Sequence, residues 1–368
     1  MFEELTGNQR VKDILKRMLQ SRRLPGALLF TGDEGVGKKL FALELARSLN
    51  CRNKQHYEAC GVCAACVRIG KITYPTDPDS DEAKQIIWSE HRDVGIVVAP
   101  KRTLRVDQMR HIEREANYRP VEGSARFFLI DQADKLNDPS SNALLKILEE
   151  PPPTSHIILI TSRPTMLLPT VLSRCQAIRF SPLTAAEIGE YLVQRNLADP
   201  DVARLRAQAA DGSIGRALAG DVEIFKSQRE SMLKIISALA TGEGKLQLLR
   251  SSEELNETQY KDQFETRLDV LERLIRDVWM LGLSEDGANH VVNSDLLPQL
   301  RKLGETIDPS RAASWLLQIE DLREQLVVNV NRKVATDALL LGMAATNCGI
   351  SDVDARSKVG IGDVRSKI

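Results

Sequence analysis

Residues 32–39 carry the sequence Gly-Asp-Glu-Gly-Val-Gly-Lys-Lys, which matches a phosphate-binding loop at every defined position but the last. That motif consists of Gly, four residues, Gly, Lys and then Ser or Thr. Its backbone N–H groups surround phosphate oxygens, its Lys reaches the outer phosphates, and its final hydroxyl holds Mg²⁺. Here Lys39 replaces that hydroxyl, and an ammonium group cannot ligate a metal ion. The nucleotide-binding residues that this altered loop predicts are Gly32, Gly35, Gly37, Lys38 and Lys39.

The sequence on both sides of the loop fits this interpretation. Residues 26–31 are predicted to form a buried strand, and apolar residues recur at helical spacing after the loop. The side chains predicted on the buried side of that helix are Leu40, Phe41, Leu43, Leu45 and Leu49. An ordinary strand–turn–helix corner is the alternative, but the two flanks together favour a nucleotide loop that has changed.

The first 180 residues alternate predicted strands with predicted helices. Further strands are predicted at 94–99, 127–130, 157–160 and 177–180, and helices at 11–19, 106–116 and 142–149. Apolar strands separated by helices indicate an α/β fold with a parallel sheet covered on both faces. Residues 73–88 are polar, acidic and contain proline, which predicts a surface insertion without chemistry.

Beyond Pro182 the strand pattern ends and helical patterns take over. Thr184-Ala-Ala-Glu187 forms a capping box that opens a short helical unit. Long amphipathic helices follow from about Val222. The predicted division is an α/β domain at 1–182, a small helical domain at 183–222, an all-helical domain at 223–350 and a polar, frayed tail at 351–368.

Composition limits the classes of protein to which the chain can belong. Its 368 residues suggest two or three domains, and its net charge of −1 argues against a general binder of polyanions. No apolar run approaches the length that spans a membrane, and the start of the chain lacks the pattern of a secretory signal. We therefore expect a soluble, cytoplasmic protein with no membrane partner.

Four of the six cysteines form a cluster with the spacing C-x₈-C-x₂-C-x₂-C. Thiolates at such spacing in a reducing compartment suit tetrahedral Zn²⁺. Iron–sulfur ligation is the main alternative for a metal, and a disulfide is disfavoured by compartment. Protein fills all four positions, so the predicted role of zinc is structural. The predicted ligands are Cys51, Cys60, Cys63 and Cys66.

The predicted strand at 127–130 is followed by Asp131 and Gln132. In nucleotide-hydrolysing folds an Asp at this strand end helps to hold Mg²⁺, and a following Glu activates the attacking water. An amide cannot accept the proton of that water, so the general base is missing here. The alternative is that Asp131 only caps the turn that follows the strand.

The stretch from Phe127 to Phe180 resembles the AAA+ clamp-loader subunits of bacterial DNA polymerase III. Two segments carry the resemblance, Asn142-Ala-Leu-Leu-Lys-Ile-Leu-Glu-Glu-Pro-Pro152 and Leu167-Leu-Pro-Thr-Val-Leu-Ser-Arg-Cys-Gln176. The altered loop, Gln132 and the segment 212–218 point to one particular, non-motor type of subunit within that family. The resemblance covers residues 1 to about 220 strongly, including the four cysteines, which match the zinc module of the family. It covers the rest weakly, mainly at 329–339.

The resemblance implies a AAA+ domain, a helical lid and a helical collar domain that joins a hetero-pentameric ring. Ser173-Arg174-Cys175 matches the arginine-finger motif, in which the Arg reaches the ATP held by a neighbouring subunit. An ordinary surface ion pair is the alternative role for Arg174. Thr161 or Ser162 matches the position that senses the γ-phosphate. Where the motor subunits carry a second sensor Arg, this chain has Gly215. Together with Lys39 and Gln132, this departure argues against hydrolysis by this chain and makes ATP and Mg²⁺ doubtful ligands of its own site.

The function expected from the resemblance is a largely non-hydrolysing clamp-loader subunit that supports ATP-driven loading of the sliding clamp on primed DNA. Its expected partners are the delta and gamma/tau subunits of the loader, the sliding clamp and, through the complex, primer–template DNA. An active gamma/tau-like ATPase of the same loader is one alternative. The other is a zinc-dependent nucleic-acid-binding protein, which the near-neutral charge disfavours.

Overall fold

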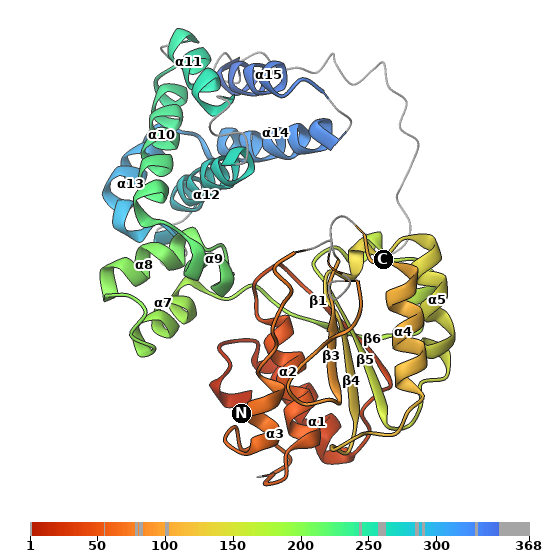
Figure 1. Cartoon of the computed structure of the whole chain (residues 1–368). Coiled ribbons are helices and arrows are strands. Elements are labelled where there is room, and N and C mark those ends of the chain that lie inside the picture. Colours follow the sequence, from red (N-terminus) through yellow and green to blue (C-terminus); the bar gives the residue numbers. More distant parts are fainter. Residues whose placement is uncertain are drawn as a thin grey trace, which may run out of the picture. The chain divides into compact units, whose positions relative to one another are not determined.

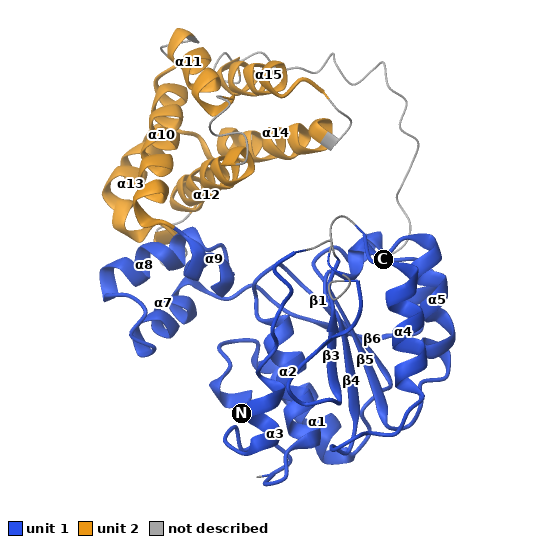
Figure 2. Cartoon of the chain, viewed as in Figure 1, with its two compact units in different colours: residues 1–220 blue, residues 221–368 orange. Residues whose placement is uncertain are grey.

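The computed structural model describes residues 2–54, 56–77, 80, 84–99, 103–242, 245–256, 263–283, 287–288, 291–327 and 330–345. The chain divides into two compact units, residues 1–220 and residues 221–368 (Figure 2). The predicted tail at 351–368 lies outside the described residues, as does Asn329. The predicted domain boundary at residue 182 falls inside the first unit and stays a prediction.

A six-stranded sheet with the order β2-β3-β4-β5-β1-β6 forms the centre of the first unit (Figure 1). The strand β2 runs antiparallel to β3, and all other neighbouring strands are parallel. The strands are β1 (Ala27–Thr31), β2 (Ile87–Trp88), β3 (Val94–Val97), β4 (Arg126–Ile130), β5 (Ser155–Thr161) and β6 (Gln176–Arg179). The prediction of an α/β fold built on a mainly parallel sheet is therefore confirmed.

Helices cover both faces of this sheet (Figure 1). The alternation of strand side chains divides the apolar residues into two cores, with Leu28 and Phe30 in one and Leu29 in the other. The first core includes buried residues of α1 (Gln9–Ser21) and α2 (Lys38–Asn50). The second includes residues of α4 (Val106–Ala116) and α5 (Asp138–Glu149). Two shorter helices complete this part, α3 (Ala64–Ile69) and α6 (Pro169–Leu172).

Three details differ from the sequence-based expectations. Leu40 is 53% exposed rather than buried, because the buried face of α2 passes through Phe41, Ala42 and Leu45 instead. Helix α5 begins before residue 142, because Asn137 caps it by accepting the N–H of Ser140 at 3.0 Å. The stretch 73–88 is more than a surface insertion, since its end pairs with the sheet as β2.

Three short helices close the first unit, α7 (Ala185–Gln194), α8 (Pro200–Ala209) and α9 (Ile214–Ala219). The predicted capping box at the start of α7 is present. The N–H of Glu187 donates to Thr184 Oγ1 at 3.2 Å, and the N–H of Thr184 donates to Glu187 Oε2 at 2.8 Å. Below we call α7 to α9 the lid helices.

Helices are the regular elements of the second unit, and its described residues contain no strand. Its first helix is capped by Asp221, which accepts the N–H of Glu223 at 2.8 Å. The helices are α10 (Val222–Thr241), α11 (Lys245–Asn256), α12 (Phe264–Leu283), α13 (Leu297–Thr306), α14 (Pro309–Val327) and α15 (Arg332–Ala345). Trp315 is fully buried and its indole N–H donates to the carbonyl of Met343 at 3.0 Å, which ties α14 to α15.

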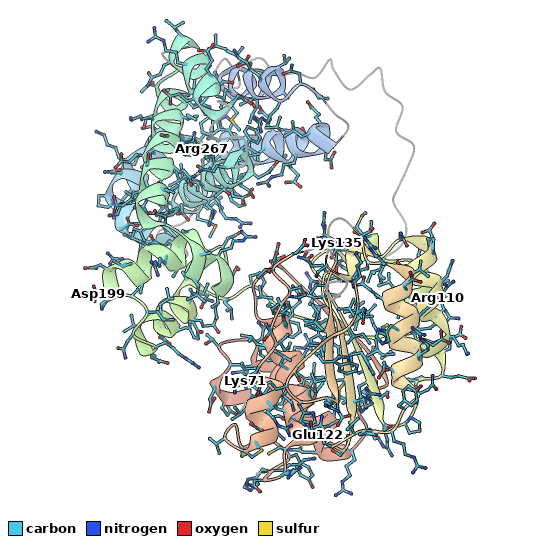
Figure 3. The ribbon with its side chains drawn as sticks, in the orientation of Figure 1. Lys71, Arg110, Glu122, Lys135, Asp199 and Arg267 are labelled. Carbon is cyan, nitrogen blue, oxygen red and sulfur yellow. The ribbon has the colours of Figure 1, made fainter. Side chains whose placement is uncertain are left out.

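The surface of the first unit carries many charged side chains, among them the labelled Lys71 and Arg110, whose side chains are 58% and 66% exposed (Figure 3). Among the helices that the structure describes, none combines the length and apolar character needed to cross a lipid bilayer.

Candidate nucleotide and metal sites

The altered phosphate loop connects β1 to α2 and has the backbone that its glycines allow. Gly32, Gly35 and Gly37 have φ angles of 136°, 78° and 98°, a region that side-chain-bearing residues rarely adopt. A Cβ atom on Gly35 would lie 2.1 Å from Ser213 Oγ of the lid segment. Gly35 therefore serves two needs, because it makes the turn and leaves space for the lid.

Lys38 is buried against the loop itself. Its ammonium donates to the carbonyl oxygens of Gly32 at 2.5 Å and Asp33 at 2.6 Å. Burial lowers the pKa of Lys38, and nearby Asp33 and Asp131 oppose that shift. The ammonium is thus held at the centre of the loop by backbone carbonyls.

Lys39 forms an ion pair with Asp131 at the end of β4, with Nζ 2.6 Å from Oδ2. Its ammonium also lies 5.4 Å from the centre of the Tyr74 ring, within the range of a cation–π contact. Burial by itself would lower the pKa of Lys39, but Asp131 and Tyr74 outweigh it and the pKa is raised. Lys39 is consequently a fixed cation at the position where the motif has a metal-binding hydroxyl.

These residues do not fit Mg²⁺. The metal takes oxygen ligands, and the side chain at position 39 supplies none. One carboxylate oxygen of Asp131 is engaged by Lys39, and the other accepts the N–H of Gln132 at 3.1 Å. Gln132 itself is exposed, with the left-handed φ of 54°. The predicted loss of the metal-binding hydroxyl and of the general base is consistent with this arrangement.

Thr161 ends β5 beside the same site. Its hydroxyl donates to Asp134 Oδ1 at 2.8 Å and accepts the N–H of Arg163 at 2.9 Å. The guanidinium of Arg163 donates to the other Asp134 oxygen at 2.9 Å. Thr161 was predicted at this site, whereas Asp134 and Arg163 were not, because no sequence motif marks them.

The lid helices contact the phosphate loop through the backbone. The N–H of Gly215 donates to the carbonyl of Gly35 at 3.3 Å. A Cβ atom on Gly215 would lie 3.3 Å from Gly35 Cα, which is a tight contact. The position that resembles the second sensor therefore contacts the loop directly and has little room there for a side chain.

A cavity of about 770 Å³ lies between the phosphate loop and the lid helices. Seven of the eight residues predicted to bind nucleotide line this cavity, namely Gly35, Gly37, Lys38, Lys39, Asp131, Gln132 and Thr161. The eighth, Gly32, does not line it. The structure thus brings these predicted residues together around one cavity large enough for a nucleotide-sized ligand.

Arg174 lies elsewhere, just after α6, and does not line this cavity. Its guanidinium contacts Glu149 at the end of α5, with Nε 2.7 Å from Oε1. A second guanidinium nitrogen donates to the carbonyl of Thr170 at 2.9 Å and approaches Ser173 Oγ at 3.4 Å. The neighbouring Cys175 is partly buried, and burial raises the pKa of its thiol to about 12.

The four predicted metal ligands form a second site. The Sγ atoms of Cys51, Cys60, Cys63 and Cys66 all lie within 4.8 Å of one another. The Cys51–Cys60 and Cys63–Cys66 pairs are 3.5 Å apart, and the Cys51–Cys63 pair is 3.8 Å apart. A tetrahedral ion with ligand distances of about 2.3 Å places its sulfurs about 3.8 Å apart. The cluster therefore fits a four-coordinate metal ion.

Backbone groups support the cysteine cluster. The N–H of Cys60 points at Cys51 Sγ and the N–H of Cys63 at Cys60 Sγ, each at 3.3 Å. Burial would raise the pKa of Cys63, but hydrogen bonds from backbone N–H groups of Cys66 and Arg52 help to lower it to about 6. A Cys63 thiolate is the form that a metal ion requires.

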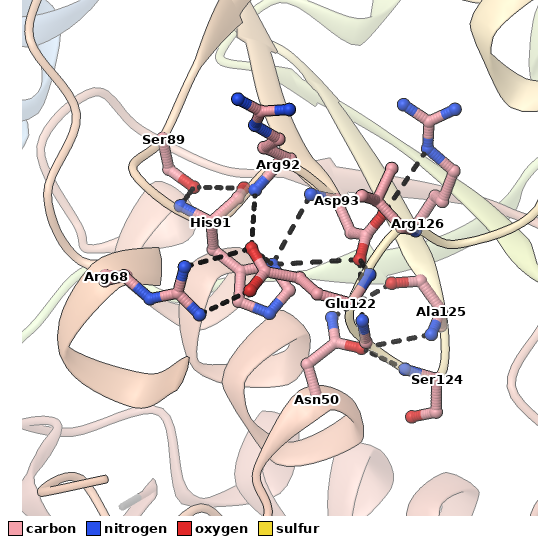
Figure 4. A network of polar contacts seen from close by, with 12 residues as sticks. Asn50, Arg68, Ser89, His91, Arg92, Asp93, Glu122, Ser124, Ala125 and Arg126 are labelled. Atoms are coloured by element: carbon pink, nitrogen blue, oxygen red, sulfur yellow. Dashed lines mark hydrogen bonds and ion pairs between the residues drawn. The ribbon is translucent and has the colours of Figure 1, made fainter. Parts of the chain in front are cut away.

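A partly buried polar network joins the cysteine module, the four-cysteine segment at residues 51–66, to the sheet (Figure 4). Arg68 of α3 donates to both carboxylate oxygens of Glu122, at 3.2 and 2.5 Å. Asp93 is fully buried and accepts the backbone N–H groups of Val121, Glu122 and Gly123 at 2.7 to 2.9 Å. The loop after α4 is therefore fixed at one place by both the cysteine module and the start of β3.

Asn50, the residue before the first metal ligand, extends this network (Figure 4). Its side-chain oxygen accepts the N–H groups of Ser124 at 2.9 Å and Ala125 at 3.0 Å, and its amide donates to the carbonyl of Ala125 at 3.0 Å. Because Asn50 ends α2, the network also links that helix to the start of β4.

Comparisons with known proteins agree with the sequence motifs. A family model described as DNA polymerase III, delta subunit, matches residues 7–184, slightly less than half of the chain. The delta-prime subunit of DNA polymerase III from Bacillus subtilis is 25% identical over 90% of this chain and 94% of its own length. The delta-prime subunit from Escherichia coli is 28% identical over 88% of this chain and 90% of its own length.

Similarity extends to a second type of subunit, of which this chain covers a smaller part. The tau subunit of DNA polymerase III from Escherichia coli is 27% identical over 92% of this chain, which spans only 53% of that relative. A solved gamma-subunit-related protein from Thermotoga maritima superimposes with a TM-score of 0.35 at 16% identity, covering 90% of this chain and 98% of that one. The sequence comparisons confirm the resemblance to DNA polymerase III subunits.

Proposed function

We propose that this chain, a homologue of the delta-prime subunits of DNA polymerase III, acts as the delta-prime subunit of a bacterial clamp loader. In this role it joins delta and gamma/tau subunits in a hetero-pentameric ring in the cytoplasm, and the ring places the sliding clamp on primer–template DNA. The similarity over most of the length of two delta-prime subunits supports this assignment. The similarity to tau leaves almost half of that relative unmatched.

The proposed subunit does not hydrolyse ATP in its own site. The observation that carries this proposal is the ion pair of Lys39 with Asp131, at 2.6 Å. It engages the carboxylate that would help to hold Mg²⁺ in a motor subunit, and it replaces the metal-binding hydroxyl with a cation. Gln132 removes the general base as well, so metal binding and activation of water are both impaired.

Its contribution to catalysis is Arg174, which acts on the ATP of a neighbouring subunit. A guanidinium keeps its charge and presents a planar set of donors to developing phosphate charge. The side chain of Arg174 is 32% exposed, so part of it is accessible from outside the chain. The surface ion pair with Glu149 is the simpler role for this residue, and experiments on the assembled loader separate the two.

We further propose that the cysteine cluster holds one structural Zn²⁺. Four protein ligands leave no position for substrate, and an ion bound there stabilises the folded chain directly. The network of Asn50, Arg68, Asp93 and Glu122 connects this module to the sheet. The metal thereby stabilises the contacts that hold residues 121–125 in the loop between α4 and β4.

Reconstitution with the delta, gamma/tau and clamp proteins of the same bacterium tests the assignment. We expect gel filtration to show one complex that contains this chain, and clamp loading on primed DNA to require it. A complex that forms and loads the clamp equally well without this chain would contradict the assignment. A competing motor role rests on Gly32, Gly37, Lys38 and Asp131, which match the nucleotide-binding motif. It predicts rapid ATP turnover by the isolated chain.

A further inference from the structure

The two departures from the nucleotide-binding motif have a joint consequence for charge. In a motor site, one Lys, Mg²⁺, the strand-end Asp and the general-base Glu together carry one net positive charge. In this chain Lys38, Lys39, Asp131 and the neutral Gln132 also carry one net positive charge. Lys39 replaces a neutral hydroxyl and adds one positive charge, and Gln132 replaces a carboxylate and removes one negative charge. Together these two changes equal the two positive charges that Mg²⁺ would bring.

The position of the added cation agrees with this balance. Lys39 Nζ lies 2.6 Å from Asp131, the carboxylate through which a motor site helps to hold its metal. The Tyr74 ring and Asp131 fix the ammonium on two sides. Both Lys39 and Asp131 line the cavity, as does Lys38. Two ammonium groups therefore lie where a polyphosphate would approach the loop.

We propose that Lys39 takes the place of Mg²⁺ and that the cavity binds a nucleoside polyphosphate in its metal-free form. This inference deepens the proposed function, because it assigns a ligand state to the site that does not hydrolyse ATP. It is independent of Arg174, which lies outside the cavity. A bound nucleotide without metal or general base is held rather than consumed, and it stabilises the contact between the loop and the lid helices.

The rest of the cavity suits the nucleoside part of such a ligand. The lid contributes Tyr191, Ile214 and Leu218 to the lining, which gives the cavity apolar and aromatic surface. A base with two π-faces packs well on such side chains. Arg195 lies in the same lining and adds a further positive charge from the lid.

Calorimetric titration of the full chain with ATP and ADP, in excess EDTA and in excess Mg²⁺, tests the inference. We expect saturable binding in EDTA that Mg²⁺ does not tighten. Inorganic tripolyphosphate should compete more weakly than ATP, because it lacks the nucleoside. Binding that requires Mg²⁺, or no binding in EDTA, would overturn the proposal. Equal competition by tripolyphosphate would overturn the assignment to a nucleotide.

Variants at position 39 locate the effect. Lys39→Met keeps the aliphatic stem and removes the charge, and we expect it to weaken binding in EDTA by about tenfold or more. Lys39→Thr restores the metal-binding hydroxyl, and its binding should become tighter on addition of Mg²⁺. Lys146→Ala is the matched control. Lys146 Nζ lies 3.2 Å from Glu113 Oε1, and neither residue lines the cavity. Its binding should equal that of the wild type.

The two variants also keep the outcome interpretable. Circular dichroism and the melting temperature report whether each variant is folded. If Lys39→Met does not fold, Lys39→Thr is used in its place. Unchanged binding in a folded Lys39→Met protein would overturn the inference. That result would leave the role of Arg174 intact, because the finger is measured through hydrolysis at a neighbouring subunit.

Discussion

The guanidinium of Arg174 rests on the carboxylate of Glu149, with Nε 2.7 Å from Oε1 across 25 positions of sequence. Glu149 is the last residue of α5, and Arg174 follows α6, so the contact joins the ends of two helices. The Thr170 carbonyl holds another guanidinium nitrogen at 2.9 Å. The side chain is thereby oriented while 32% of it stays exposed. An oriented, accessible guanidinium is what action on a neighbouring phosphate requires.

Glu149→Gln should slow ATP hydrolysis at the neighbouring subunit by about two- to tenfold, because it removes a charge-assisted contact that orients Arg174. The measurement is the steady-state rate of phosphate release by the reconstituted loader. Glu150→Gln serves as the control. Glu150 is exposed, and its replacement leaves the contact between Glu149 and Arg174 intact. A rate at or above that of the wild type for Glu149→Gln would contradict an orienting role.

The isolated chain should release phosphate from ATP at or near background. The physical reason is the absence of both a metal-binding hydroxyl at Lys39 and a general base at Gln132. Lys39→Thr combined with Gln132→Glu should recover only weak activity, because Gly215 lacks the second sensor side chain. Turnover by the wild-type chain comparable with that of a gamma/tau subunit would refute this prediction.

Sequence patterns located much of this architecture because buried strands and helices have distinct apolar periods. The predicted strands at 127–130 and 157–160 fall within β4 and β5, and the predicted helix at 106–116 matches α4. Leu40 was misplaced because an unbroken apolar run after the loop does not reveal which residues face the sheet. Asn137 was overlooked as a cap, so the start of α5 was placed too late.

The candidate site was only partly predictable for a similar reason. Motif positions identified Lys39 and Asp131 separately, but no sequence spacing shows that their side chains meet. Tyr74 was assigned to an insertion without chemistry, yet its ring lies against the ammonium of Lys39. Glu149 belongs to a quoted family segment, but its contact with Arg174 depends on how two helix ends meet in the fold.

Purified protein should contain about one zinc per chain, held by the four cysteines. Removal of the metal, or Cys63→Ser, should lower the melting temperature by several degrees, because the bound ion stabilises only the folded chain. Elemental analysis and thermal unfolding measure these effects. Cys175→Ser is the control, since Cys175 lies outside the cluster. Metal-free protein from a purification without chelators, with unchanged stability, would contradict the proposed site.

The buried ring of His91 should make stability depend on pH. Burial lowers its pKa despite the opposing effect of Glu122 and Asp93, and its Nδ1 accepts the N–H of Asp93 at 3.4 Å. The folded chain therefore favours neutral His91. Its contribution to stability is fully present above the pKa of His91 in the unfolded chain, about 6.5. The contribution is lost as the pH falls below that value, because His91 must then be protonated in a buried position. Between about pH 7.5 and about pH 5.5, the wild type should lose up to about 1 kcal/mol more unfolding free energy than His91→Gln.

Urea unfolding at both pH values measures this difference. His111→Gln is the control for removal of an imidazole, because His111 is partly exposed and its contact at 3.9 Å is with Glu115 of the same helix rather than with Asp93. This variant should lose as much unfolding free energy on acidification as the wild type does. An equal loss in the wild type and in His91→Gln would show that His91 does not carry the pH dependence.

The proposed action of Arg174 on the ATP of a neighbouring subunit is tested most directly by ATP hydrolysis in a loader assembled with Arg174→Ala. Arginine fingers contribute on the order of 10³-fold or more in other phosphoryl-transfer systems, and the effect here is diluted by the remaining ATP sites of the loader. We expect a folded chain and an intact ring by gel filtration, with slower hydrolysis and slower clamp loading. Arg174→Lys should also slow hydrolysis and clamp loading, because an ammonium lacks the planar set of donors of a guanidinium. Equal rates for wild-type and Arg174→Ala assemblies would contradict the account.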